Sequence, residues 1–195
     1  MALPKEIPVK KTFCFLFAAL ASASMVAFAQ ETPSAPPNPM TMSEKGIYGY
    51  IAGQVVAAAE QMPEENYSFK PTPEVRSFGQ VVAHIADAQY GFCSEVTGET
   101  APVKDIEKTK TSKADLVAAL KGGVAYCKKA FDAMTDAQGV QMMKMGNYSL
   151  TKLGVLSVNT AHMNEHYGNM VTYMRLKGLA PVGNQPASRP ASSQK

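Results

Sequence analysis

The residues that decide the fold are 149–181, SLTKLGVLSVNTAHMNEHYGNMVTYMRLKGLAP. This stretch contains no proline until its last residue, Pro181. Gly178 followed by Pro181 is the order typical of the end of a helix. We therefore expect one helix from about 149 to 177, roughly 43 Å long at about 1.5 Å per residue. His162 and His166 are four residues apart in it, so their imidazole rings leave the same helix face.

Three earlier segments also place apolar residues at helical spacing. They cover about 43–62, 77–98 and 112–131, and no segment alternates apolar and polar residues for long enough to predict a strand. The sequence thus predicts an all-α fold, a four-helix bundle, with either up-and-down or crossover connections. The expected cap and stop residues are Ser43, Pro63, Ser77, Gln80, Gly98 and Ser112. The apolar stripe expected for the first helix is Ile47, Tyr50, Ile51, Val55, Ala58 and Met62.

Residues 1–29 have the composition of a secretory signal peptide. Three lysines precede an uncharged, mostly apolar run at 12–28, and the triplet AFA at 27–29 offers small residues for cleavage before Gln30. The alternative is an anchor that stays in the membrane, but the run is short for a span and rich in Ala and Ser near its end. We expect cleavage, bacterial export and a periplasmic or secreted protein without a stable membrane anchor.

The composition predicts three further segments after the signal peptide. They are a Pro-rich linker at 30–42, the bundle at 43–180 and a disordered tail at 181–195. A chain of 195 residues that is 46% apolar can bury one core of ordinary size. The net charge of +3 falls to +1 without the signal peptide, so no electrostatic surface for nucleic acid is expected. A homodimer formed through an exposed helix face is compatible with the sequence.

All three histidines of the chain fall on or beside helix faces that we expect to point inward. His162 and His166 have the spacing by which one helix gives two imidazoles to one metal ion, and His84 lies beside the apolar stripe of the second helix. Three neutral imidazoles suit Zn, Ni, Fe or Cu and leave positions open for water or substrate. The alternative is three hydrogen-bonded core residues, although an unpartnered buried imidazole would cost about 1–3 kcal/mol. Candidates for contacts around the histidines are Gln80, Asn159, Glu165, Asn169 and Tyr173.

Two stretches resemble the DinB / YfiT-like superfamily: RSFGQVVAHIADAQYGFC at 76–93 and NTAHMNEHYGNMVTYMRLKGLAP at 159–181. The resemblance covers about residues 43–182 and includes one histidine of the second helix and the H-x-x-x-H pair of the fourth. It implies a four-helix bundle with a crossover connection between the second and third helices. The metal ligands that it implies are His84, His162 and His166.

The resemblance implies several kinds of chemistry. Some members of the superfamily resemble metal-dependent hydrolases, and others resemble transferases or isomerases that depend on a small cytosolic thiol, which the export signal argues against. Our hypothesis is an exported protein that binds a divalent transition metal (Zn, Ni or Fe) and acts as a hydrolase or transferase on a small molecule. The alternatives are a non-catalytic periplasmic metal- or ligand-binding module and a scaffold whose histidines hold no metal.

A second motif overlaps the histidine pair. Residues 162–166 also fit H-x-x-E-H, the inverted zinc-protease pattern, in which Glu165 would be the general base. That pattern needs a distant acidic third ligand and a cleft between larger lobes. Because His84 already supplies a third ligand, we favour the three-histidine site.

The mature chain retains two cysteines, Cys93 and Cys127. If the second and third helices run parallel and adjacent, as the resemblance implies, the two thiols lie at similar heights in the bundle. An exported protein would then oxidise the pair to a disulfide, which is expected to add about 2–4 kcal/mol. The alternative is two buried free thiols that act as small apolar side chains.

Overall fold

The structure is a computed structural model that describes residues 36–181. The predicted signal peptide and nearly all of the predicted tail lie outside the described residues. Within the described part, none of the helices combines the length and apolar character that crossing a membrane requires.

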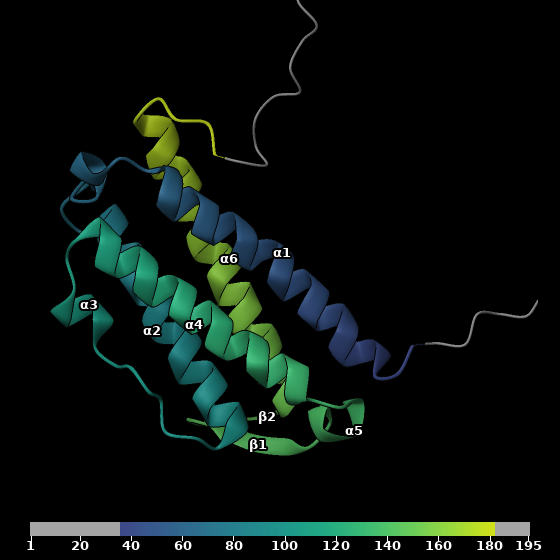
Figure 1. The fold of residues 1–195 in the computed structure, drawn as a ribbon. Coiled ribbons are helices and arrows are strands. Elements are labelled where there is room, and N and C mark those ends of the chain that lie inside the picture. The colour runs from purple at the N-terminus through teal and green to yellow at the C-terminus, as the bar shows by residue number, and fades with distance from the viewer. Residues whose placement is uncertain (1–35, 182–195) are drawn as a thin grey trace, which may run out of the picture. The chain divides into compact units, whose positions relative to one another are not determined.

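Four long helices pack lengthwise around one core in the described part of the chain (Figure 1). Each of them packs against two others, in the ring order α1, α4, α2, α6. Two short strands and three short helical segments occupy the connections. The long helices are α1 (Pro39–Gln61), α2 (Phe78–Thr97), α4 (Lys113–Ala133) and α6 (Lys152–Leu176). The short elements are η1 (Glu64–Asn66), α3 (Ile106–Thr109), α5 (Asp136–Gly139), β1 (Met142–Met145) and β2 (Tyr148–Thr151).

The helices α2 and α4 are neighbours and run parallel. Near their starts Gly79 lies against Leu116, and near their ends the Cα atoms of Cys93 and Cys127 are 5.3 Å apart. Two parallel neighbours need a connection that returns along the bundle, and residues 98–112, with α3 among them, provide it (Figure 1). The connection between the second and third long helices is therefore the crossover that the resemblance implied.

Local capping signals place most helix ends where the sequence predicted them. Ser77 and Gln80 form a reciprocal capping box at the start of α2, and Gly98 ends that helix with φ of 78°. Such a φ favours glycine, because a side chain is strained there. Ser112 accepts a hydrogen bond from the backbone nitrogen of Asp115 at the start of α4.

The start of α1 differs from the prediction. The helix begins at Pro39, four residues before the expected cap Ser43, so the end of the predicted linker is helical. Proline suits the first helical position, because its missing N–H has no intrahelical partner there. The Asp136 carboxylate accepts from the backbone nitrogens of Met40 (3.1 Å) and Thr41 (2.8 Å), so a distant residue caps the helix.

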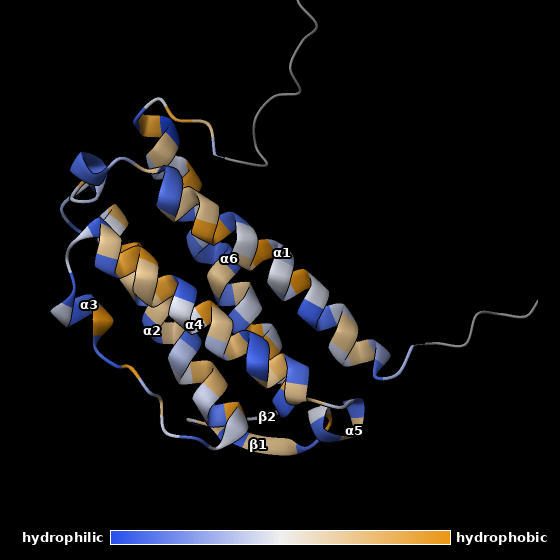
Figure 2. Cartoon of the chain, in the orientation of Figure 1, coloured by the Kyte–Doolittle hydropathy of each residue, from blue (hydrophilic) through white to orange (hydrophobic). Residues whose placement is uncertain are grey.

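The buried face of α1 is also rotated from the predicted one. Ile47 and Tyr50 are 52% and 70% exposed, whereas Tyr48 is 2% exposed. Tyr48 can lie inside the bundle because its hydroxyl donates to the side-chain oxygen Oε1 of the buried Gln89 at 2.9 Å. The predicted positions Val55, Ala58 and Met62 do face the core. Apolar residues occur along all four long helices (Figure 2).

The sequence prediction missed a β-hairpin. Strands β1 and β2 pair antiparallel, with Met145 opposite Tyr148 across a two-residue loop. Gly146 opens that loop with φ of 55°, a backbone conformation that glycine adopts without strain. Strands of four residues are too short to show a clear alternation. As a result α6 begins at Lys152, with Thr151 as its N-cap, and not near Ser149.

Candidate metal centre

The three histidine side chains meet between α2 and α6. His84 Nε2 lies 3.1 Å from His162 Nε2, and His166 Nε2 also lies 3.1 Å from His162 Nε2. The ligand nitrogens of all three rings lie within 4.8 Å of one another. Metal–nitrogen bonds of about 2.0–2.1 Å separate adjacent ligands of an octahedral or tetrahedral ion by about 2.8–3.4 Å. Both 3.1 Å contacts fit that range, so the three predicted ligands are positioned to hold one metal ion.

The helix geometry explains this convergence. His162 and His166 are four residues apart on α6, and their ring centroids are 4.4 Å apart. The helix α2 packs antiparallel to α6. His84 contacts His162 and His166, whereas Gln89, five residues later on α2, contacts Asn159, which lies earlier on α6. His84 therefore reaches the pair from the facing helix, one turn before the buried Gln89.

Partial burial favours the neutral form of the three rings. Desolvation is the largest cause that lowers the pKa of His84, His162 and His166 below 6.5. A nearby cation adds to the effect, because Arg76 also lowers the pKa of each ring. Neutral imidazole is the form that binds a metal ion, so the site needs no prior loss of a proton at neutral pH.

The outer nitrogens of the three rings have different surroundings. His84 Nδ1 lies 3.6 Å from Oε2 of Glu107, and His166 Nδ1 lies 3.4 Å from the Asn169 amide nitrogen. Within the described residues, His162 Nδ1 is buried and has no hydrogen-bond partner. The His162 ring instead packs against Phe92, with centroids 5.8 Å apart. Each ring is thus held by a different kind of contact.

Glu107 is a residue of the site that sequence reasoning missed. It lies on α3, a four-residue helix in the crossover connection, 23 positions after His84. Its Oε1 accepts from Arg76 Nε at 2.9 Å while Oε2 faces His84. Such a short helix has no periodic pattern, and only the packing of the crossover onto α2 brings the carboxylate to the histidine.

The other sequence candidates divide between the site and ordinary structural roles. Asn169 lies beside His166, and Glu165 is close enough to offset part of the lowering of the pKa of His162 and His166 that burial causes. Tyr173 donates to the backbone oxygen of Arg76 at 3.1 Å, which ties the start of α2 to α6. Gln80 forms the capping box of α2, and Asn159 is fully buried among other core groups.

An apolar groove of about 410 Å³ lies between α2 and the hairpin. Phe92 lines it from α2, and Tyr148, which is 69% exposed, lines it from β2. Because the Phe92 ring also packs against His162, the groove and the histidine cluster share a wall.

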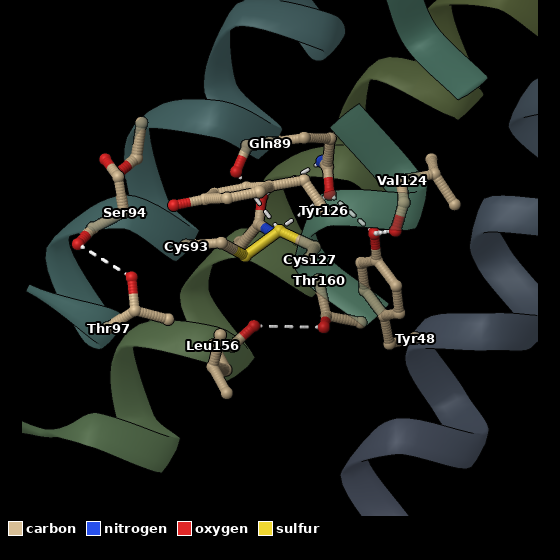
Figure 3. Close-up of a disulfide and its surroundings, with 12 residues drawn as sticks. Tyr48, Gln89, Cys93, Ser94, Thr97, Val124, Tyr126, Cys127, Leu156 and Thr160 are labelled. Carbon is tan, nitrogen blue, oxygen red and sulfur yellow. Dashed lines mark hydrogen bonds between the residues drawn. A yellow bond between two sulfur atoms is a disulfide. The ribbon is translucent and has the colours of Figure 1, made fainter. Parts of the chain in front are cut away.

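Cys93 and Cys127 form a disulfide in the structure (Figure 3). The bridge joins α2 to α4, and both residues are fully buried. Gln89 and Asn159 form a reciprocal amide pair beside it, with both hydrogen bonds 3.0 Å long. The Asn159 amide nitrogen also lies 3.3 Å from Cys127 Sγ. The Tyr48 hydroxyl donates to Gln89 (Figure 3). These five residues, the amide–disulfide cluster, link all four long helices.

Comparisons with known proteins agree with this architecture. The family model of the DinB superfamily matches residues 52–170. A DinB-like protein of Bacillus cereus has a similar structure, with a TM-score of 0.66 and 17% sequence identity over 76% of this chain and 97% of that one. A DinB-like protein of Bacillus subtilis gives a TM-score of 0.60 and 21% identity over 74% and 99% of the two chains.

A conserved protein of Enterococcus faecalis is similar in fold as well, with a TM-score of 0.59 and 17% identity over 70% of this chain and 95% of that one. Among curated proteins, none matches the chain significantly. The family match spans more than half of the sequence and includes all three histidines. The chain therefore belongs to the DinB superfamily.

Proposed function

We propose that the protein binds one divalent transition-metal ion through His84, His162 and His166 and acts on a small molecule as a metal-dependent hydrolase or transferase. The convergence of three Nε2 atoms carries the proposal. Without an ion, His162 Nε2 must serve as partner to two other ring nitrogens, and at most one proton lies on it. An ion satisfies all three lone pairs together. Zn, Ni and Fe suit such a donor set.

Held by the three histidines, a metal ion would supply Lewis-acid chemistry toward a carbonyl or phosphoryl group. The protein's own residues would supply the rest of the site. Phe92 shields one side of His162, and the groove beside it offers a place for an apolar part of the substrate. Arg76 and Glu107, which pair at 2.9 Å, lie at the side of His84 and offer both a donor and an acceptor to polar parts of the substrate.

The proposal includes export, because residues 1–29 resemble a cleavable signal peptide. The disulfide supports it, since such bonds persist in oxidising compartments. We propose a periplasmic or secreted protein, without nucleic-acid partners or a lasting membrane anchor. A homodimer is compatible with the exposed Ile47 and Tyr50 of α1.

Elemental analysis of protein purified without an affinity tag tests metal binding directly. We expect about one equivalent of Zn, Ni or Fe per wild-type chain, and almost none in the double variant His162→Ala/His166→Ala. The matched control is Asn164→Ala, which changes an exposed residue between the two histidines and should leave the metal content unchanged. A wild-type protein that takes up none of these metals, or a double variant that holds as much, would contradict the proposal.

The alternative function is a binding module without turnover. It is favoured by one observation: the partners that the structure gives the inner Nε2 atoms are other histidine Nε2 atoms, not a serine, cysteine or carboxylate of the described residues. Cobalt substitution separates the two functions. A change in the visible spectrum on adding acetohydroxamate shows exchangeable positions on the ion and supports an enzyme, whereas an unchanged spectrum supports the binding module.

A further inference from the structure

We propose that Glu107 is a positioning residue of the metal centre, which acts through His84 and is delivered by the crossover connection. The inference rests on the proposed metal site. It assigns a role at the site to α3, the four-residue helix of the crossover connection. Three sets of contacts carry it: the anchor of α3, the orientation of the carboxylate and the approach to His84.

The anchor of α3 is Asp87. Its two carboxylate oxygens accept from the backbone nitrogens of Ile106 and Glu107, both at 2.9 Å. The Ile106 side chain is fully buried and packs in the core. Asp87 is three residues after His84 on α2, so one helix face carries both the histidine and the attachment point of the segment that approaches it.

The orientation of the Glu107 carboxylate is set by Arg76. The Arg76 Nε–H donates to Oε1 at 2.9 Å, which leaves Oε2 facing His84. Arg76 is itself held near the site, because its backbone oxygen accepts from the Tyr173 hydroxyl of α6. The side chain of Glu107 is 27% exposed, so water only partly screens its charge from the histidine.

The approach to His84 decides which ring nitrogen carries the proton. Oε2 lies 3.6 Å from Nδ1, longer than a hydrogen bond but close enough for a carboxylate to favour the Nδ1–H tautomer. That tautomer leaves the Nε2 lone pair free, and Nε2 is the atom that faces His162. A carboxylate behind a histidine ligand orients the ring and makes it a stronger donor.

The test uses Glu107→Ala and Glu107→Gln, with Asp105→Asn as the matched control. Asp105 lies on the same connection, two residues earlier, and its recorded side-chain partner is Lys108. Competition with a coloured chelator for Zn²⁺ should show about 10–100-fold weaker binding for the alanine variant. The glutamine variant keeps an oxygen acceptor, so its loss should be smaller, and the control should bind like wild type.

Nitrogen-15 NMR of the metal-free protein provides a readout that does not depend on a bound metal. We expect His84 to be protonated on Nδ1 in the wild type and in Asp105→Asn, and to lose that preference in Glu107→Ala. An unchanged tautomer together with unchanged Zn²⁺ affinity would overturn the role of Glu107. If the wild type binds no metal but the tautomer depends on Glu107, the proposed function fails while the positioning contact stands.

Discussion

Two polar clusters lie next to each other on the facing helices α2 and α6, and they differ in how their polar groups are satisfied. The amide–disulfide cluster is fully buried, and Tyr48, Gln89 and Asn159 exchange hydrogen bonds within it. The histidine cluster lies one turn away and is only partly buried. Its Nε2 atoms face one another, and His162 Nδ1 lacks a partner within the described residues.

The difference indicates that the two clusters serve different purposes. Buried polar groups that satisfy one another add to the uniqueness and stability of a core. Polar groups that face one another without enough protons to share are costly unless a ligand completes them. We therefore expect substitutions in the amide–disulfide cluster to act on folding, and substitutions in the histidine cluster to act on metal binding and on the response to pH.

The largest expected effect on stability comes from the disulfide. Replacing both residues, Cys93→Ala/Cys127→Ala, opens a link between residues 34 positions apart. We expect the free energy of unfolding to fall by about 2–5 kcal/mol, measured by urea denaturation. Reducing agent should bring the wild type to the same stability and leave the variant unchanged. If reductant has no effect on the wild type, the cysteines are not bridged and the cluster has no covalent link.

A smaller effect is expected from the amide pair. In Asn159→Leu, the buried Gln89 amide nitrogen loses its acceptor, Asn159 Oδ1, which should cost about 1–3 kcal/mol of unfolding free energy. The double variant Gln89→Leu/Asn159→Leu should lose less than the sum of the single variants, because it removes both polar groups together. Additive losses in this cycle would show that the two amides do not stabilise each other.

The sequence predicted the roles of some of these residues and not of others. Ser77, Gln80, Gly98 and Ser112 act within one turn of their own helix, so their local pattern was enough to predict them. The pair His162 and His166 is likewise local, because two residues four positions apart on one helix share a face.

Contacts between distant segments left no such signal. Whether His84 meets the pair depends on which helices are neighbours, and the resemblance to a family supplied that expectation. Asp136 caps α1 from 95 residues away, and Glu107 reaches His84 from a four-residue helix. The rotation of α1 had a similar cause, since the buried position of Tyr48 depends on Gln89 of another helix. Spacing along the chain does not encode these pairings.

The smallest expected effect is on how the unfolding free energy of the metal-free protein depends on pH, and it distinguishes the two clusters. Burial lowers the pKa of the three histidines in the folded state below the unfolded value of 6.5. As pH falls through 6.5, the unfolded chain binds protons before the folded protein does, so stability declines with falling pH. The carboxylates with lowered pKa, such as Asp132 and Asp136, lose their contribution only below their own unfolded value of 3.8.

Urea denaturation between pH 7.5 and about 5.5, with chelator present, therefore reports mainly on the histidines. The double variant His162→Ala/His166→Ala should lose less stability over this range than the wild type. The variant Cys93→Ala/Cys127→Ala should be less stable at every pH but show the wild-type slope, since it removes no group that titrates there in the bridged protein. Equal slopes for wild type and the histidine variant would mean that the imidazoles are no more buried than in the unfolded chain. The contrast between a core cluster whose polar groups are hydrogen-bonded and a histidine cluster whose polar groups lack partners would then be wrong.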